Sequence, residues 1–245
     1  MPKPAPSSDN LTEPIKRFEH DSHIGDYIYG ANDGIITTFA VVSGVAGAAL
    51  SPSIVIILGV ANLLADGFSM AASNYLGKRS EEDFVLAAYD RQRQAIVADP
   101  EKEREHIRRL YAAKGFSGEK LDHAVETVTA EIGLWIDTVI HEEFRLAEIE
   151  PGGAIQGAIA TFVAFLVAGA VPLIPYVLHF PVESQFGWSI LLMALALFSV
   201  GSARTLITKR NWLRSGVEML IVGSIAAVGS YGIGNALKLA GVAGA

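Results

Sequence analysis

Long apolar runs alternate with polar segments over most of the chain. Each run comes close to the ~20 apolar residues that a membrane-spanning helix needs. A strongly polar stretch separates the second run from the third. This pattern predicts an all-α membrane protein with five transmembrane helices and a helical insert between helices two and three. The apolar runs lie near residues 34–50, 54–65, 152–178, 187–203 and 219–237.

The composition supports this interpretation. Of the 245 residues, 51% are hydrophobic and 18% are charged, whereas about 25% charged residues is usual in a soluble protein. The absence of cysteine excludes disulfides and a thiolate metal site. The chain then divides into an N-terminal segment, the first two spans, the insert and the last three spans, at residues 1–26, 27–77, 78–150 and 151–245.

Lysine and arginine are distributed unevenly between the polar segments. Residues 78–145 hold eleven of the 19 basic residues, whereas the turn at 50–53 and the loop at 179–187 hold none. Cytoplasmic loops of membrane proteins carry an excess of lysine and arginine. The N-terminus and the insert are therefore expected in the cytoplasm, and the C-terminus on the outside. Five spans require the same opposite placement of the two termini.

The second span carries a polar stripe inside its apolar run. Asn62, Asp66 and Met70 recur every four residues and so share one face of a helix. Asp33 lies near the start of the first span. Carboxylates inside a bilayer normally face a bundle interior or a hydrated path. The thioether of Met70 favours transition metals over Mg2+ or Ca2+. Together with the two carboxylates, it indicates a cation pathway. The alternative is structural: both aspartates would bond neighbouring helix ends, and Asp33 could cap its own helix.

Three helices are expected in the insert. The first, at 81–97, continues the second span, and the next begins at Asp99 and Pro100, which suit an N-cap and a first helical position. That second helix ends at Gly115. The third is long, because apolar residues recur at intervals of three and four. These are Leu121, Val125, Val128, Ile132, Trp135, Val139 and Ile140.

Two groups of insert residues could bind a metal ion. Glu103 and His106 form an E-x-x-H pattern, which places two ligands on one helical face as in di-iron bundles. His141, Glu142 and Glu143 follow each other directly. The alternative is a solvated acidic face whose carboxylates pair with neighbouring arginines.

Two segments then give the chain a family resemblance. "GANDGIITTFAVVSGVAGA" and "GVANLLADGFSMAASNYLGKRSE" resemble the first two spans of the vacuolar iron transporter family. The five-span plan with an insert after the second span is similar as well. The resemblance implies a homodimeric carrier that exchanges Fe2+, or in some members Mn2+, for protons along a path at the dimer interface. For this chain it implies the inner membrane of a bacterium.

The resemblance also assigns residues in the spans. Asp33 matches the aspartate of the family's first span, and Met70 matches the methionine of its second. The family often has a glutamate where this chain has Asn62, and here an acid follows one turn later as Asp66.

In the insert, relatives bind cations through glutamates on its helices. Glu103 and His106 match one glutamate pair of that pattern, and Glu142 or Glu143 match the acids before the third span. Another family pair falls here near Gln92 and Ala95. A metal site in this insert would therefore have fewer carboxylates, or use His106 and His141.

These features predict a transporter that moves Fe2+ or Mn2+ out of the cytoplasm by proton antiport, for detoxification or storage. The partners are divalent metal ions, protons, the lipid bilayer and a second copy, with no prosthetic group. A membrane-anchored iron-binding or iron-oxidising module is the alternative, and a membrane interaction protein is a third possibility. No glycine loop for phosphates is present in the sequence, and neither an enzyme activity nor a nucleic-acid partner is expected.

Overall fold

The computed structural model describes residues 23–144, 152–205 and 211–242, and every regular element among them is a helix. Most of the N-terminal segment, residues 1–22, lies outside the described residues. In chain order the helices are α2 (Ile24–Gly47), α3 (Pro52–Ala98), α4 (Pro100–Ala113), α5 (Glu119–Thr129), α6 (Ile132–Val139), the π-helix η2 (Ile140–Phe144), α7 (Gly153–Gly169), the 3-10 turn η3 (Val171–Leu173), α8 (Ile174–Val177), α9 (Val182–Ala203) and α11 (Trp212–Leu239).

Four segments of the described chain are long and apolar enough to cross a membrane. They are Pro52–Ala98, Gly153–Val177, Val182–Ala203 and Trp212–Leu239. The helix expected as the first span, α2, has 24 residues, but Asn32 and Asp33 lower its hydropathy and it is not among the four. The all-helical membrane class is confirmed, and the fifth span stays a prediction.

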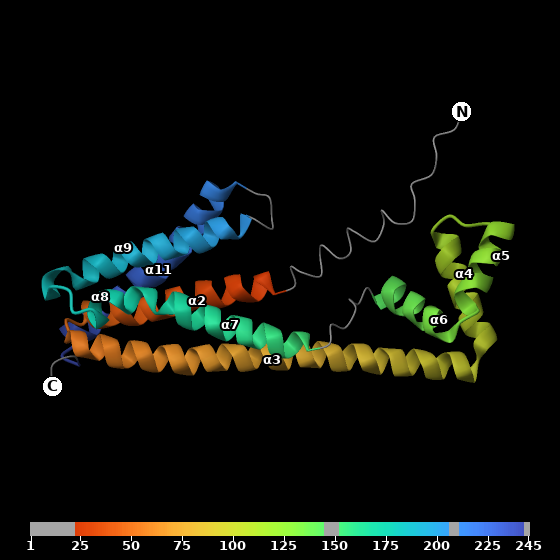
Figure 1. Ribbon diagram of the computed structural model, residues 1–245, viewed down its shortest axis with the longest axis horizontal. Coiled ribbons are helices and arrows are strands. Elements are labelled where there is room, and N and C mark those ends of the chain that lie inside the picture. Colours follow the sequence, from red (N-terminus) through yellow and green to blue (C-terminus); the bar gives the residue numbers. More distant parts are fainter. Residues whose placement is uncertain (1–22, 145–151, 206–210, 243–245) are drawn as a thin grey trace, which may run out of the picture. The chain divides into compact units, whose positions relative to one another are not determined.

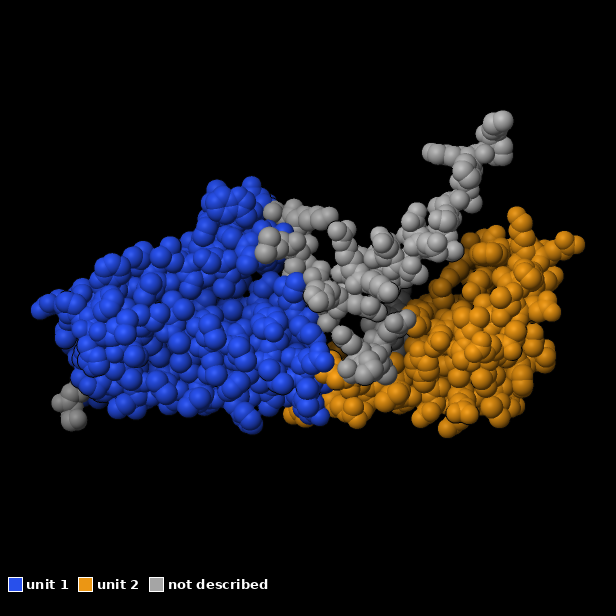
Figure 2. Space-filling model, viewed as in Figure 1, with its two compact units in different colours: residues 1–75, 154–245 blue, residues 76–153 orange. Residues whose placement is uncertain are grey.

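The chain separates into two compact units (Figure 2). The first contains residues 1–75 and 154–245, and the second contains residues 76–153. As expected, the second apolar run and the first helix of the insert form one continuous helix, α3, of 47 residues.

In the first unit, α2 is the central helix. Its buried side chains Ile35, Phe39 and Val42 belong to a core that Phe165 of α7 and Leu197 of α9 complete. Phe39 also stacks on Phe186 of α9, with ring centroids 6.2 Å apart. Figure 1 shows α2 beside α7, with α9 and α11 next to it. The position of α2 among these helices fixes where Asp33 lies.

Glycines let α2 approach α7 and α11 closely. A Cβ atom at Gly34 would collide with the carbonyl oxygen of Phe165, and one at Gly47 with that of Tyr231. A Cβ atom at Gly234 of α11 would collide with the carbonyl oxygen of Gly44. Small residues allow such close packing of backbones within a membrane.

This close packing predicts that Gly234→Ala destabilises the protein. The added methyl group has no room beside the α2 backbone, and overpacking of this kind costs typically about 1–3 kcal/mol. Gly232→Ala on the same helix is the matched control, since a Cβ atom there meets nothing within 4 Å and alanine favours a helix. Thermal unfolding in detergent should show a lower Tm for Gly234→Ala and an unchanged or higher Tm for Gly232→Ala. Equal Tm values would contradict the packing.

The second unit has its own apolar core. Buried residues from α3, α4, α5 and α6 meet in it, among them Ile96, Ile107, Val125 and Trp135. The predicted start of α4 is confirmed, because the side chain of Asp99 accepts a hydrogen bond from the backbone N–H of Lys102 at 3.1 Å. Its predicted end is confirmed too: Gly115 follows α4 with a φ angle of +94°, a conformation that favours glycine.

The prediction of one long third helix in the insert is wrong. Glu131 has extended backbone angles, φ −122° and ψ 127°, which separate α5 from α6. The break turns Ile132 outward, where it is 45% exposed, whereas Val128 and Trp135 remain buried. The apolar spacing continues across Glu131, so the sequence pattern does not reveal the break. Two short helices can pack on each other as well as on α3 and α4, which buries more of the stripe than one straight helix would.

Candidate functional site

Asp33 lies well inside helix α2, which begins at Ile24 with His23 at its N-cap position. The suggestion that Asp33 caps its own helix is therefore wrong. The polar residues around Asp33 hid the true start of the helix, because the apolar run begins only after them. The hydroxyl of Thr37 donates to the backbone carbonyl of Asp33 at 2.9 Å. This bond uses the backbone oxygen and leaves the Asp33 carboxylate available.

The carboxylates of Asp33 and Asp66 lie close enough to repel each other electrostatically. Asp33 is half-buried on α2, and Asp66 is exposed on α3. Two like charges in an environment of low polarity are unfavourable unless a proton or a cation lies between them. The pair therefore has the charge and the oxygen donors that a divalent cation requires.

Asn62 and Met70 are one turn to either side of Asp66 on α3. Both side chains are partly buried, and Met70 packs against the core of the first unit. The Nδ2 atom of Asn62 is buried with no hydrogen-bond partner in the described part of the chain. Asn62 thus adds a polar group with unused bonding capacity beside the carboxylate pair.

A further residue of this kind, Asn32, was not among the predicted site residues. Its Oδ1 atom is buried and also has no hydrogen-bond partner among residues 23–144, 152–205 and 211–242. Its neighbour Asp33 was singled out because of its charge. The sequence shows Asn32 as an amide in an otherwise apolar helix. The sequence alone cannot predict whether this amide is buried or faces outward.

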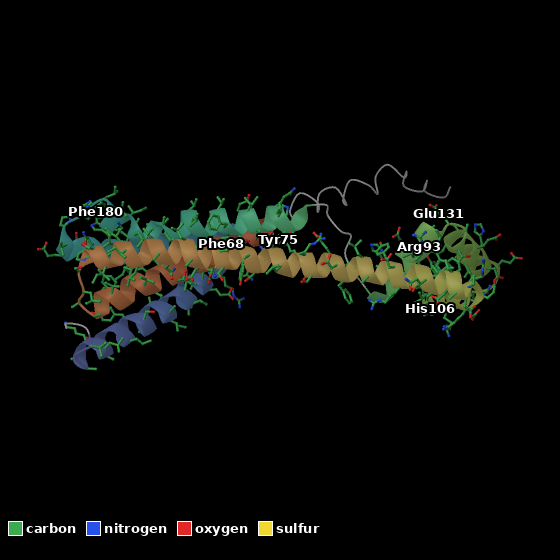
Figure 3. The ribbon with its side chains drawn as sticks, turned by 90° about the horizontal axis from the view of Figure 1, so that it is seen from below. Phe68, Tyr75, Arg93, His106, Glu131 and Phe180 are labelled. Atoms are coloured by element: carbon green, nitrogen blue, oxygen red, sulfur yellow. The ribbon has the colours of Figure 1, made fainter. Side chains whose placement is uncertain are left out.

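Among the described side chains, the predicted ligands Glu103, His106 and Glu142 do not come together in one group. Glu103 accepts a hydrogen bond from Nε2 of Gln92 on α3 at 2.8 Å. Glu142 instead forms an ion pair with Lys114. His106 is partly buried on α4 (Figure 3), and the side chain of Glu143 lies outside the described part of the structure. No group of three or more histidine, cysteine, aspartate or glutamate side chains suited to a metal ion occurs among the described residues.

The described helices define a class: a helical membrane protein that carries an ionisable side chain, Asp66, in a helix long and apolar enough to cross a membrane. The chain belongs to the VIT family, whose sequence model matches residues 24–235.

Relatives named vacuolar iron transporters match most of the chain. The chain is 31% identical to "Vacuolar iron transporter 1" of Arabidopsis thaliana over 223 residues, which cover 91% of this chain and 88% of the relative. It is 29% identical to the protein of the same name from Tulipa gesneriana, covering 96% of each chain. It is also 31% identical to the "Vacuolar iron transporter" of Plasmodium berghei (strain Anka), covering 91% of this chain and 86% of that relative.

Proposed function

We propose that this protein carries Fe2+, and also Mn2+, out of the cytoplasm in exchange for protons. The relatives named above are iron transporters, and α3, α7, α9 and α11 provide membrane-length helices. In this proposal the protein serves metal detoxification or storage and lies in the inner membrane of a bacterium, with its N-terminus and insert in the cytoplasm and its C-terminus outside. Asp33, Asn62, Asp66 and Met70 line the path of the ion.

The observation that carries the proposal is the electrostatic repulsion between the carboxylates of Asp33 and Asp66, which come from two helices. Metal ligands must lose their protons before they bind a cation. When no cation is bound, repulsion between the two carboxylates favours the uptake of a proton. Because the pair holds either a proton or a metal ion, metal leaving the cytoplasm is coupled to protons that move in the opposite direction.

The exposure of Asp66 supports a homodimer. Ile57, Leu64 and Phe68 on α3 are 66%, 56% and 69% exposed (Phe68 is labelled in Figure 3), and the Asp66 carboxylate is exposed as well. A carboxylate at the bilayer centre costs at least about 2.5–3.5 kcal/mol, so lipid is an unfavourable neighbour for it. We propose that a second copy of the chain covers this part of α3 and encloses the ion path.

We assign the insert the task of collecting the ion from the cytoplasm. Glu103, His106, Glu142 and Glu143 remain the proposed ligands, with the ion acting as cargo. Glu103 would exchange its bond to Gln92, and Glu142 its bond to Lys114, for bonds to the metal. Both present partners are replaceable, because an amide and an exposed ion pair each contribute little stability.

We expect Met70→Leu to reduce selectivity for transition metals. Leucine has nearly the volume of methionine, so stability should fall by less than about 1.5 kcal/mol, but the soft sulfur donor is lost. Fe2+ uptake should fall up to about tenfold, equivalent to ~1.4 kcal/mol, while any Mg2+ flux stays the same. Uptake of each metal into liposomes, alone and in competition, measures this.

Met219→Leu is the matched control for that measurement. Met219 on α11 is also partly buried against the core of the first unit, so it reports the effect of the exchange on packing alone. If both variants retain the Fe2+ uptake of the original protein, Met70 does not contact the ion.

The transport function itself is tested with purified protein in liposomes. Fe2+ added outside should enter protein-containing liposomes and remain absent from protein-free ones. Oxygen consumption that accompanies Fe2+ addition, with no metal entering the lumen, would overturn the proposal and indicate an iron-oxidising module instead.

A further inference from the structure

Asn74 of α3 makes hydrogen bonds to two other helices. Its Nδ2 atom donates to Oδ1 of Asp26 on α2 at 2.9 Å. The same atom donates to Oγ1 of Thr161 on α7 at 2.6 Å. The backbone carbonyl of Gly157, one turn earlier on α7, lies 3.3 Å from it. One amide group therefore joins α3 to both α2 and α7.

These partners determine how the Asn74 amide is oriented. An ionised carboxylate and a backbone carbonyl only accept hydrogen bonds, so the NH2 group, and not the amide oxygen, faces them. The group is largely shielded from water, because Thr161 is 0% exposed and the side chain of Asp26 is 12% exposed. A buried acceptor that loses its donor is costly. The bonds of Asn74 therefore resist any movement of α3 that would break them.

The same stretch of α7 fixes the position of α2. A Cβ atom at Gly30 would collide with the carbonyl oxygen of Thr161. A Cβ atom at Gly34 would collide with that of Phe165, four residues further along α7. The order of these contacts shows that α2 and α7 run in the same direction. Gly34 directly follows Asp33 in the sequence, so the part of α2 that carries Asp33 packs at the level of Phe165.

Helix α3 meets the same two residues of α7 in the reverse order. Asn74 bonds to Thr161. A Cβ atom at Gly67 would lie 3.1 Å from Cδ1 of Phe165. Residue numbers thus fall along α3 as they rise along α7, and the two helices are antiparallel. Gly67 directly follows Asp66 in the sequence, so the part of α3 that carries Asp66 also packs at the level of Phe165.

Phe165 therefore marks one level at which both carboxylates lie, and the bonds of Asn74 lie about one turn nearer the start of α7. At the level of Phe165, α3 packs through Gly67, which has no side chain to oppose sliding. If α3 slipped along α7 by one turn, Asp66 would move by ~5.4 Å relative to Asp33. The polar contact one turn away opposes this slip.

We propose that Asn74 is a positioning residue: its bonds to Asp26 and Thr161 fix the register of α3 against α2 and α7, and this register sets the depth of Asp66 relative to Asp33. The NH2 group that makes the bonds is a donor and cannot bind a cation, so Asn74 acts through the two carboxylates. The inference rests on the proposed function, because it takes these carboxylates as the ion site.

The first test uses Asn74→Asp, which keeps the shape of the side chain but places a second carboxylate opposite Asp26. We expect the KM for Fe2+ uptake into liposomes to rise roughly 3- to 30-fold, the range found when a residue acts on a site through its neighbours. The kcat per inserted protein should change less. A residue that only stabilised the fold would lower the amount of folded protein and leave KM unchanged.

The exchanged pair, Asp26→Asn together with Asn74→Asp, is the matched comparison. It restores one amide donor opposite one carboxylate and has the net charge of the original protein. The hydroxyl of Thr161 can donate as well as accept, so it can bond to the new carboxylate on α3. The exchanged pair should recover most of the original KM.

The second test measures the register itself by spin labels, and it needs no metal. The sequence contains no cysteine, so Tyr29→Cys on α2 and Leu58→Cys on α3 introduce the only labelling sites; these positions are 62% and 46% exposed. Labelled protein is diluted with unlabelled protein, so that distances within one chain dominate. Asn74→Asp should shift or broaden the distance distribution, and the exchanged pair should restore it.

Two variants of Thr161 test the same bond if Asn74→Asp does not fold. Valine has the shape of threonine without the oxygen, so Thr161→Val should shift the label distance and KM in the same direction, by a smaller amount. Thr161→Ser keeps the hydroxyl and should leave both close to the original. Labels at Leu195→Cys and Ile225→Cys, on exposed positions of α9 and α11, should not respond to any of these changes.

An unchanged label distance and an unchanged KM in Asn74→Asp would overturn the inference. An exchanged pair that restores neither would overturn it too, since the bond between positions 26 and 74 would then not set the register. If the labels respond as expected but the original protein transports no Fe2+, the proposed function fails and the register stands. If Fe2+ is transported but the labels do not respond, the inference alone fails.

Discussion

Replacing Asp33 by asparagine is expected to lower Fe2+ transport by roughly 10- to 100-fold. An interaction with a charged group contributes about 1.5–3 kcal/mol, which corresponds to that range in affinity. Asparagine has nearly the same shape and keeps one oxygen, so α2 should still pack on α7 and α11. Uptake of Fe2+ into inside-out membrane vesicles, normalised to the amount of inserted protein, measures the effect.

Glu218→Gln is the control for the loss of one carboxylate. Glu218 is exposed on α11, one of the four helices able to cross a membrane, and it has no role in the proposed path. Its variant should transport Fe2+ at nearly the original rate. If Asp33→Asn transports as well as Glu218→Gln, the assignment of Asp33 is wrong.

Replacing Asp66 by asparagine is expected to lower transport by a similar factor of roughly 10- to 100-fold. The Asp33 carboxylate would lose its like-charged neighbour, and the residual flux should depend less on a pH gradient. Because both carboxylates act on one ion, the double variant should lose much less than the product of the two single losses. Vesicle uptake by the two single variants and the double variant gives the comparison.

Multiplicative losses in the double variant would show that Asp33 and Asp66 act independently and would remove the basis for a shared site. A variant that retains the carboxylate, Asp66→Glu, is the second comparison. It should recover part of the activity, because the charge is kept and its position shifts by one bond.

Much of the fold could be predicted from the sequence, because a long apolar run directly indicates a helix that lies in lipid. The extension of α3 beyond the membrane-length run and the start of α4 at Asp99 both followed from local patterns and are confirmed. The break at Glu131 did not follow, because apolar spacing is the same in one helix or two. The first span remains a prediction because the polar residues that suggest its function, Asn32 and Asp33, also lower its hydropathy.

The candidate site was predictable only where charge made residues conspicuous. Asp33 and Asp66 stood out as carboxylates among apolar neighbours, and the structure places each within range of the other's charge. Glu103 and Glu142 matched a pattern for metal ligands, yet tertiary packing gave them other partners, Gln92 and Lys114. Asn74 of α3 donates hydrogen bonds to Asp26 of α2 and Thr161 of α7, which lie far from it in the sequence. No local pattern in the sequence reveals such contacts.

The measurement that tests the central claim most directly is Fe2+ uptake into inside-out vesicles with an imposed pH gradient. The metal is added on the cytoplasmic face, and the vesicle interior is made either acidic or equal in pH to the outside. Protons on the interior side favour release of the metal from the carboxylate pair, so an acidic interior should accelerate uptake several-fold, and a protonophore should abolish the acceleration. Asp66→Asn should show little acceleration. Uptake that is the same with and without the gradient would contradict proton-coupled transport through Asp33 and Asp66.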